Sequence, residues 1–179
     1  GVWIGLRPAF SQVAQPIIQF LAAFPANLFY PVMVVLITTY DLNADIWTSP
    51  LIILGTQWYI LFNVIVGTIA LPKTYKYVAK NFHLKGWLWW KRLILPGIFP
   101  YYVTGAITAA GGAWNASVVA ECLHWGSKKV QATGLGNYIA NSYETGDSHR
   151  LALGIVIMCI FVVTINRFLV VLILSIAAT

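Results

Sequence analysis

Long runs of uncharged, mostly apolar residues alternate with short polar segments along this chain. Residues 8–40, 46–72 and 93–120 contain no charged side chain, which gives runs of 33, 27 and 28 residues. A helix needs about 20 apolar residues to cross the hydrocarbon core of a bilayer. A fourth run of 16 uncharged residues, 151–166, is followed by a second apolar piece, 168–179. The pattern predicts four or five membrane spans and therefore an all-α integral membrane protein, a multi-span helical bundle.

Prolines interrupt the first apolar region. Pro16, Pro25 and Pro31 lie in or beside residues 17–39, and each removes a backbone hydrogen bond that a continuous helix would need. We therefore expect a bent or broken span here. We also expect the whole chain, 1–179, to form one transmembrane domain.

The charges between the runs predict how the spans are oriented. The segment 40–49 carries two aspartates and no Lys or Arg, whereas 73–92 carries six of the eleven positive charges of the chain. Basic residues beside membrane spans favour the cytoplasmic side. We therefore place the segment 73–92 in the cytoplasm and the segment 40–49 outside.

The composition supports a membrane protein and argues against several other classes. Hydrophobic residues make up 59% of the chain and charged residues 9%, against about 25% charged in soluble domains. The net charge of +6 is explained by its position beside the spans, so we expect no nucleic-acid partner. Cys122 and Cys159 show no ligand-type spacing with His83, His124 or His149, so no disulfide, metal or catalytic role is assigned to them.

The basic segment contains a short amphipathic pattern. Tyr75, Val78, Ala79 and Phe82 recur at helical spacing on one face, and lysines recur on another. The pattern predicts a surface helix that Gly86 ends or bends. Two interpretations stay open from the pattern alone: the lysines face anionic lipid, or the apolar stripe docks into a groove of a partner protein.

The same segment carries a spaced motif. Tyr77-Val-Ala79 is followed by three residues, His83, nine residues and Leu93-Ile-Leu-Pro96. This resembles the signature of binding-protein-dependent ABC transporter permeases, which reads Glu-Ala-Ala, three residues, Gly, nine residues, Ile-x-Leu-Pro. Ala79, Leu95 and Pro96 match by identity, whereas Tyr77 and His83 depart from the Glu and Gly of the family.

Further segments resemble the nitrate, sulfonate and taurine branch of these permeases. They are Phe20-Leu-Ala-Ala-Phe-Pro-Ala26, Leu95-Pro-Gly-Ile-Phe-Pro100 with Gly105, Trp114 with Val118-Val-Ala-Glu121, and Gly134-Leu-Gly136. Together they extend the resemblance over roughly residues 17–168.

The resemblance implies the membrane-spanning subunit of an ATP-driven importer for a small anion, of the nitrate, sulfonate or bicarbonate class, in a bacterial inner membrane. The implied partners are an ABC ATPase, a second permease domain and an external substrate-binding protein. The chain itself is expected to be no enzyme and to bind no cofactor, with ATP and Mg²⁺ on the ATPase, since no phosphate loop occurs in it. The resemblance implies that the segment 73–92 couples the two subunits. The coupling residues are then Tyr75, Tyr77, Val78, Ala79, Phe82, His83, Gly86, Leu95 and Pro96.

Candidate residues for the translocation path lie on the small-residue stretch 105–120, which we expect to pack closely against other helices. Thr108 and Asn115 either line the path or hydrogen-bond between helices, and Trp114 lies beside them. Glu121 is either part of an outer gate or a headgroup-level carboxylate paired with Lys128 or Lys129.

One alternative function stays open: a structural or assembly subunit of another membrane complex. An intramembrane enzyme is disfavoured, because no predicted span shows paired carboxylates, a histidine cluster or a nucleophile with its base. Gly1 in place of an initiator methionine predicts a piece of a longer or duplicated permease. The residues alone leave open the substrate and the choice between a homodimer and a fused second copy.

Overall fold

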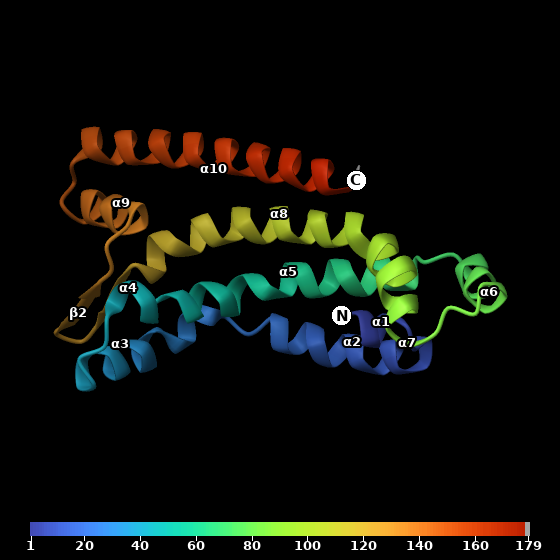
Figure 1. Ribbon diagram of the computed structural model, residues 1–179. Helices are drawn as coiled ribbons and strands as arrows, with labels where there is room; N and C mark the ends of the chain where they lie inside the picture. The colour runs from blue at the N-terminus through green and yellow to red at the C-terminus, as the bar shows by residue number, and fades with distance from the viewer. Residues whose placement is uncertain (178–179) are drawn as a thin grey trace. The chain divides into compact units, whose positions relative to one another are not determined.

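The computed structural model describes residues 1–177, so that Ala178 and Thr179 of the apolar tail lie outside the described residues. Helices dominate the chain, as predicted, and one short β-hairpin interrupts them (Figure 1). The elements in chain order are α1 (Val2–Gly5), α2 (Pro8–Ala22), the 3-10 helix Ala26–Phe29, α3 (Tyr30–Thr39), α4 (Ala44–Trp47), α5 (Ser49–Ile69), α6 (Lys73–Asn81), α7 (Gly86–Trp89), the π-helix Trp90–Ile94, α8 (Leu95–Ala120), β1 (Cys122–Trp125), β2 (Lys128–Gln131), α9 (Leu135–Glu144) and α10 (Ser148–Ala177).

Three continuous helical stretches are long and apolar enough to cross a membrane. Within the described chain they are Ala44–Ile69, Gly86–Ala120 and Ser148–Phe168. A fourth span is reached if Pro8–Ala22 and Ala26–Thr39 count as one broken span. The prediction of an all-α, multi-span membrane protein is confirmed. The predicted four or five spans compare with three candidate spans, or four if the broken pair counts as one.

The three prolines of the first apolar region act differently. Pro25 stands at the break between two helices, as expected. Pro31 lies in the first turn of α3, where its missing N–H costs no hydrogen bond. Pro16, by contrast, lies inside α2, which continues through it. The helical region is thus broken at Pro25, whereas the sequence alone suggested that each of the three prolines could bend or interrupt it.

The chain divides into two compact units, and each has its own apolar core. The first unit comprises Gly1–Ala23 and Trp58–Ala109. Its core joins α5, α6 and the start of α8, with Val64, Ala79, Leu93, Ile94 and Ile98 buried together. Partly buried side chains of α1 and α7 pack against this cluster.

Close helix contact in the first unit depends on glycine. A Cβ added to Gly67 would lie 2.5 Å from the ring of Tyr101, and one added to Gly105 would lie 2.9 Å from Cα of Ile60. These two positions let α5 and α8 approach at backbone distance, as expected for small residues in membrane helices. Gly111, in the same small-residue stretch, has open space around it among the described residues.

The second unit comprises Phe24–Gln57 and the residues from Ala110 onward. Its core joins α3, α5, the end of α8 and the hairpin, and includes the fully buried Val34, Leu123 and Ala120. Two polar contacts fix the hairpin region: Lys128 Nζ donates to Thr38 Oγ1 at 3.0 Å, and the backbone N–H of Thr133 donates to the Asp45 carboxylate. α9 lies against α10, where Gly154 allows Tyr138 to approach (Figure 1).

The hairpin was not predicted, although the sequence holds a signal for it. Cys122 pairs with Gln131 and Trp125 with Lys128 in an antiparallel register, which leaves Gly126 and Ser127 as a two-residue turn. Gly126 has a φ of 60°, as the first position of a type II′ turn requires. Strands of four residues in an apolar chain are too short to show an alternating pattern clearly.

Candidate functional site: the basic segment and its helix

The segment 73–92 folds as a short surface helix followed by the entry to a long one. α6 begins directly after Pro72, whose extended conformation precedes the first helical residue. It ends at Asn81, so the predicted helix is confirmed with nearly the expected bounds. Gly86 was expected to end or bend this helix, but α6 ends five residues earlier. Gly86, with a φ of 56°, is instead the residue at which α7 begins.

The predicted apolar stripe divides between the core and the surface. Ala79 is only 6% exposed and packs in the core of the first unit with Leu93 and Ile94. Phe82, by contrast, is 73% exposed, and Tyr77, which was not assigned to the stripe, is 67% exposed. Ala79 therefore holds α6 against the start of the α8 span, and large aromatic side chains form its free surface.

Tyr75 and Val78 lie between these extremes, at 40% and 44% exposed. With Arg92 and Leu93 they line a shallow, open depression in the first unit. They thus border both the free surface and the region where α6 meets α8.

The end of α6 is a Schellman motif with a histidine in the left-handed position. The N–H of Leu84 donates to the carbonyl of Ala79 at 2.8 Å, and the N–H of His83 donates to that of Lys80 at 3.2 Å. His83 has a φ of 48°, in a region that residues other than Gly adopt uncommonly, with Asn, Asp and His the most frequent among them. The permease signature carries Gly at this position, and the geometry gives a physical reason for that choice.

The entry to α8 contains a π-helical turn. Residues Trp90–Ile94 form it, and Leu95 and Pro96 follow as the first residues of α8. Pro96 has no N–H to donate to the preceding turn, and single π turns of this kind are common at functional sites. Leu93 and Ile94 are buried in the core, whereas Leu95 and Pro96 are exposed.

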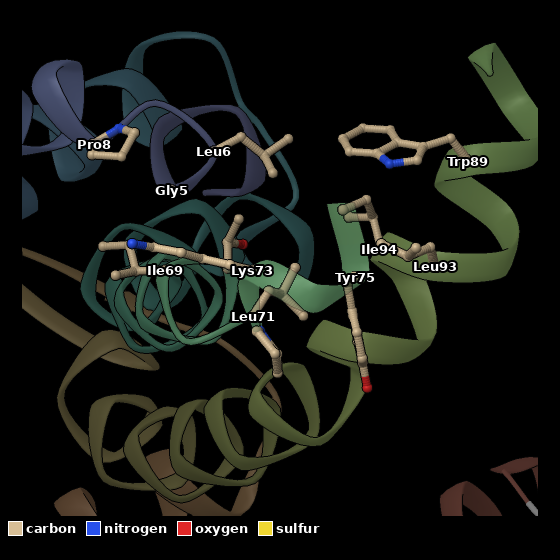
Figure 2. Close-up of a pocket in the computed structure, with 12 residues that line it drawn as sticks. Gly5, Leu6, Pro8, Ile69, Leu71, Lys73, Tyr75, Trp89, Leu93 and Ile94 are labelled. Carbon is tan, nitrogen blue, oxygen red and sulfur yellow. The ribbon is translucent and has the colours of Figure 1, made fainter. Parts of the chain in front are cut away.

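A small cavity lies beside this region (Figure 2). Its volume is about 140 Å³, and it is lined by mainly apolar side chains of α1, α2, the end of α5, α6 and the α7 region. Lys73 and Tyr75 reach it from α6, and the ring of Trp89 faces Leu6 across it. Ligand sites typically measure about 300–1,000 Å³, so this cavity is a gap where α6 and the α7 region meet the rest of the unit.

The positive charges of the segment have no internal partners among the described side chains. The ion pairs of the described residues involve His124, Lys129 and Arg150 with Glu144 or Asp147, and none involves a described side chain of the segment 73–92. The side chain of Lys76 is not described. No carboxylate occurs anywhere between Asp45 and Glu121. The segment therefore presents a basic surface with exposed aromatic side chains.

The predicted path residues Thr108, Trp114 and Asn115 all lie on α8. Thr108 is exposed and its hydroxyl donates to the carbonyl of Thr104, four residues earlier. Asn115 is exposed. Trp114 instead stacks on Phe161 of α10, with ring centroids 6.4 Å apart and planes at 23°. A role for these residues in a path stays a prediction.

Glu121 has a defined structural partner. Its Oε2 accepts from the backbone N–H of Asn137 at 3.0 Å, in the first turn of α9. The N-cap of α9 is Gly134, which has no side chain to satisfy this turn, so Glu121 supplies the acceptor and a negative charge at the positive end of the helix.

The expected pairing of Glu121 with Lys128 or Lys129 is wrong. Lys128 donates to Thr38, and Lys129 contacts Glu144 at 2.7 Å. The carboxylate is drawn to the N-terminus of α9 because that helix packs directly on the end of α8. A Cβ added to Gly136 would lie 2.5 Å from the carbonyl carbon of Ser117.

Comparison with known proteins agrees with these observations. A family model described as "Binding-protein-dependent transport system inner membrane component" matches residues 1–178. The nitrate import permease protein NrtB of Leptolyngbya laminosa is 28% identical over 156 residues, which cover 87% of this chain and 52% of that protein. The bicarbonate transport system permease protein CmpB of Synechocystis is 27% identical over 144 residues, which cover 80% and 48%.

The chain thus spans about half the length of the curated relatives it matches. The match covers both compact units, the basic segment and the candidate spans. On this evidence the chain is a membrane protein that belongs to the family of binding-protein-dependent transport system inner membrane components.

Proposed function

We propose that this chain is a membrane-spanning part of an ATP-driven importer for a small anion, and that α6 receives the ATPase subunit. The observation that carries the proposal is the division of α6 into two faces. Tyr77 and Phe82 are exposed on one side, and Ala79 is buried beside Leu93 and Ile94 on the other.

This arrangement suits the transmission of movement. The exposed aromatic side chains offer a compact contact for a groove on a partner, a common mode of helix recognition. The buried face packs on Ile94 and Ile98, at the start of the helix that crosses the membrane as α8. A displacement of α6 by the ATPase would therefore act directly on the cytoplasmic end of a span.

Nitrate or bicarbonate is the proposed substrate class, because the relatives bear these names. The helices α5 and α8 carry no charged side chain. Anion binding would then depend on backbone amides, helix ends and neutral donors, which stabilise anions without a fixed cation. The proposed location is a bacterial inner membrane, with a second permease domain and an external binding protein as further partners.

The docking proposal is tested by charge substitution on the exposed face. Tyr77→Glu and Phe82→Glu place a carboxylate where an apolar contact is expected, while the exposure of both side chains preserves the fold. The full-length protein is co-expressed with the ATPase subunit of the proposed importer, and association is measured by co-purification in detergent. We expect a loss of at least about tenfold, equivalent to about 1.4 kcal/mol.

Tyr143→Glu is the matched control, because Tyr143 is 76% exposed and lies on α9. It should leave association unchanged. Undiminished association of both α6 variants would refute the docking proposal. Ala79 is unsuitable for this test, since a larger residue there would disturb the core.

The substrate class needs a separate measurement. Cells that lack their own nitrate and bicarbonate importers would express the complete transporter, and uptake of each labelled anion would be compared in the same cells. Saturable uptake of one anion, competed by unlabelled anion of the same kind, would support the assignment. Uptake of neither, with the ATPase still associated, would reject the substrate class and leave the docking proposal standing.

A further inference from the structure

Three side chains of different chemistry converge on one face of the hairpin in the second unit. Cys122 and His124 are two residues apart on β1, so they point to the same side of the strand. Glu144, the last residue of α9, lies against that side. One potential ligand atom from each of the three lies within 4.8 Å of the others.

We propose that Cys122, His124 and Glu144 bind a divalent transition-metal ion of the zinc class. Cys, His and carboxylate together form a donor set that suits Zn²⁺, with Co²⁺ as a substitute. Ca²⁺ and Mg²⁺ are disfavoured, because they take oxygen ligands.

The distances are close to those that a tetrahedral ion requires. Glu144 Oε1 lies 3.8 Å from Cys122 Sγ and 3.6 Å from His124 Nε2. Ligand bonds of about 2.0–2.3 Å at tetrahedral angles place such atoms roughly 3.4–3.6 Å apart. The two distances from Glu144 Oε1 are thus within a few tenths of an ångström of that range, and the remaining pair, Cys122 Sγ and a His124 ring nitrogen, lies within 4.8 Å.

The two oxygens of Glu144 have separate partners. Oε2 accepts from Lys129 Nζ at 2.7 Å, which leaves Oε1 directed toward Cys122 and His124. Lys129 also donates to Asn141 Oδ1 at 3.0 Å, so its position is fixed by α9 as well. Such contacts around a ligating carboxylate orient it and are a regular part of metal sites.

Metal binding requires Glu144 as a carboxylate and Cys122 as a thiolate. The hydrogen bond from Lys129 holds the pKa of Glu144 below its ordinary value, so the carboxylate is ionised. Burial raises the pKa of the Cys122 thiol, with Lys129 opposing this effect. On binding, the thiol loses its proton to solvent and the thiolate sulfur bonds to the ion, so metal uptake releases one proton from Cys122.

The site has room for an exchangeable ligand. The His124 and Glu144 side chains are 46% and 42% exposed, and three protein ligands leave a fourth position for water or a small external ligand. The ion would join β1 to the end of α9 through Cys122 and Glu144, which are 22 residues apart in sequence. It would thereby cross-link the hairpin to the helix that packs on α10.

Cobalt spectroscopy on the full-length protein in detergent, with any affinity tag removed, tests the site. We expect one equivalent of Co²⁺ to produce thiolate-to-metal charge-transfer absorption and the visible bands of a tetrahedral site, and Zn²⁺ to displace it. Cys122→Ser should abolish the charge-transfer band. His124→Ala and Glu144→Gln should each weaken Co²⁺ binding by at least about tenfold.

Cys159→Ser and His149→Ala are matched controls, because both residues lie on α10 and neither belongs to the cluster. Both variants should bind Co²⁺ as the native protein does. Absence of the charge-transfer band in the native protein, or its persistence in Cys122→Ser, would overturn the proposal. Amide exchange of the native protein gives an independent test. Zn²⁺ should slow exchange in both 122–125 and 141–144, and unchanged exchange in both segments would equally overturn it.

Discussion

Replacement of His83 by glycine is expected to stabilise the end of α6. His83 occupies the left-handed position of a Schellman motif, with a φ of 48°. Two hydrogen bonds hold it there, from the N–H groups of His83 and Leu84 to the carbonyls of Lys80 and Ala79. The Leu84 side chain packs against the core cluster that contains Ala79, so the motif also has its usual apolar contact.

The magnitude follows from two opposing effects. An L-residue in the left-handed region costs about 1–2 kcal/mol, and glycine removes that cost. Glycine also gives the unfolded chain more freedom, which costs about 0.4–1 kcal/mol. No hydrogen bond or ion pair of the His83 side chain occurs among the described contacts, so little else is lost. The difference between the two effects is about 0–1.6 kcal/mol, and we take the middle of that range, so His83→Gly should stabilise the end of α6 by about 0.5–1 kcal/mol.

Amide hydrogen exchange measures this effect locally, where it arises. A gain of about 0.5–1 kcal/mol slows exchange of the 82–84 amides by about two- to fivefold, if the segment opens without global unfolding. His83→Ala is the control, because alanine keeps the backbone cost and should not slow exchange. Faster exchange in His83→Gly than in His83→Ala would refute the assignment of strain to this position.

Substitutions at three further positions, Gly111, Gly136 and Glu121, test the packing and capping at the other end of α8. Gly136→Ala should destabilise the protein by about 1–3 kcal/mol, because its Cβ would meet the backbone of Ser117 at 2.5 Å. Gly111→Ala, with open space around it in the described chain, should be neutral or stabilising, and thermal unfolding in detergent compares the two. Glu121→Ala should cost about 0.5–2 kcal/mol through loss of the α9 cap, whereas Glu121→Gln keeps an acceptor and should lose only about 0.3–1 kcal/mol. Equal stability of Gly136→Ala and Gly111→Ala, or of all three residues at position 121, would contradict these assignments.

Much of the fold and of the coupling segment could be predicted because each depends on local pattern. The uncharged runs predict the spans, since a bilayer accepts only segments whose backbone is internally hydrogen-bonded. The helical spacing of Tyr75, Val78, Ala79 and Phe82 predicts α6. The pattern does not tell whether Ala79 faces the core or a partner protein, because a core and a docking groove are both apolar.

The roles of Glu121 and Cys122 required contacts between distant segments. Sequence proximity suggested a lysine partner for Glu121, yet α9 folds back onto α8 and presents the N–H of Asn137 instead. Cys122 and His124 lack the spacing of known zinc motifs, and their third neighbour, Glu144, lies on a different element. A search for one Cys and one His on the same face of a strand would have found only two of the three proposed metal ligands.

The sequence by itself determined that the basic segment carries an amphipathic helix and that the apolar runs belong in a bilayer, because charge and hydrophobic period act over a few residues. Tertiary structure decided the faces and the partners. It turned Ala79 inward, placed His83 in a conformation suited to glycine, and brought Glu144 to Cys122 and His124. These outcomes depend on which helix surfaces pack against one another. The sequence does not decide this, because many surfaces of this chain are similarly apolar.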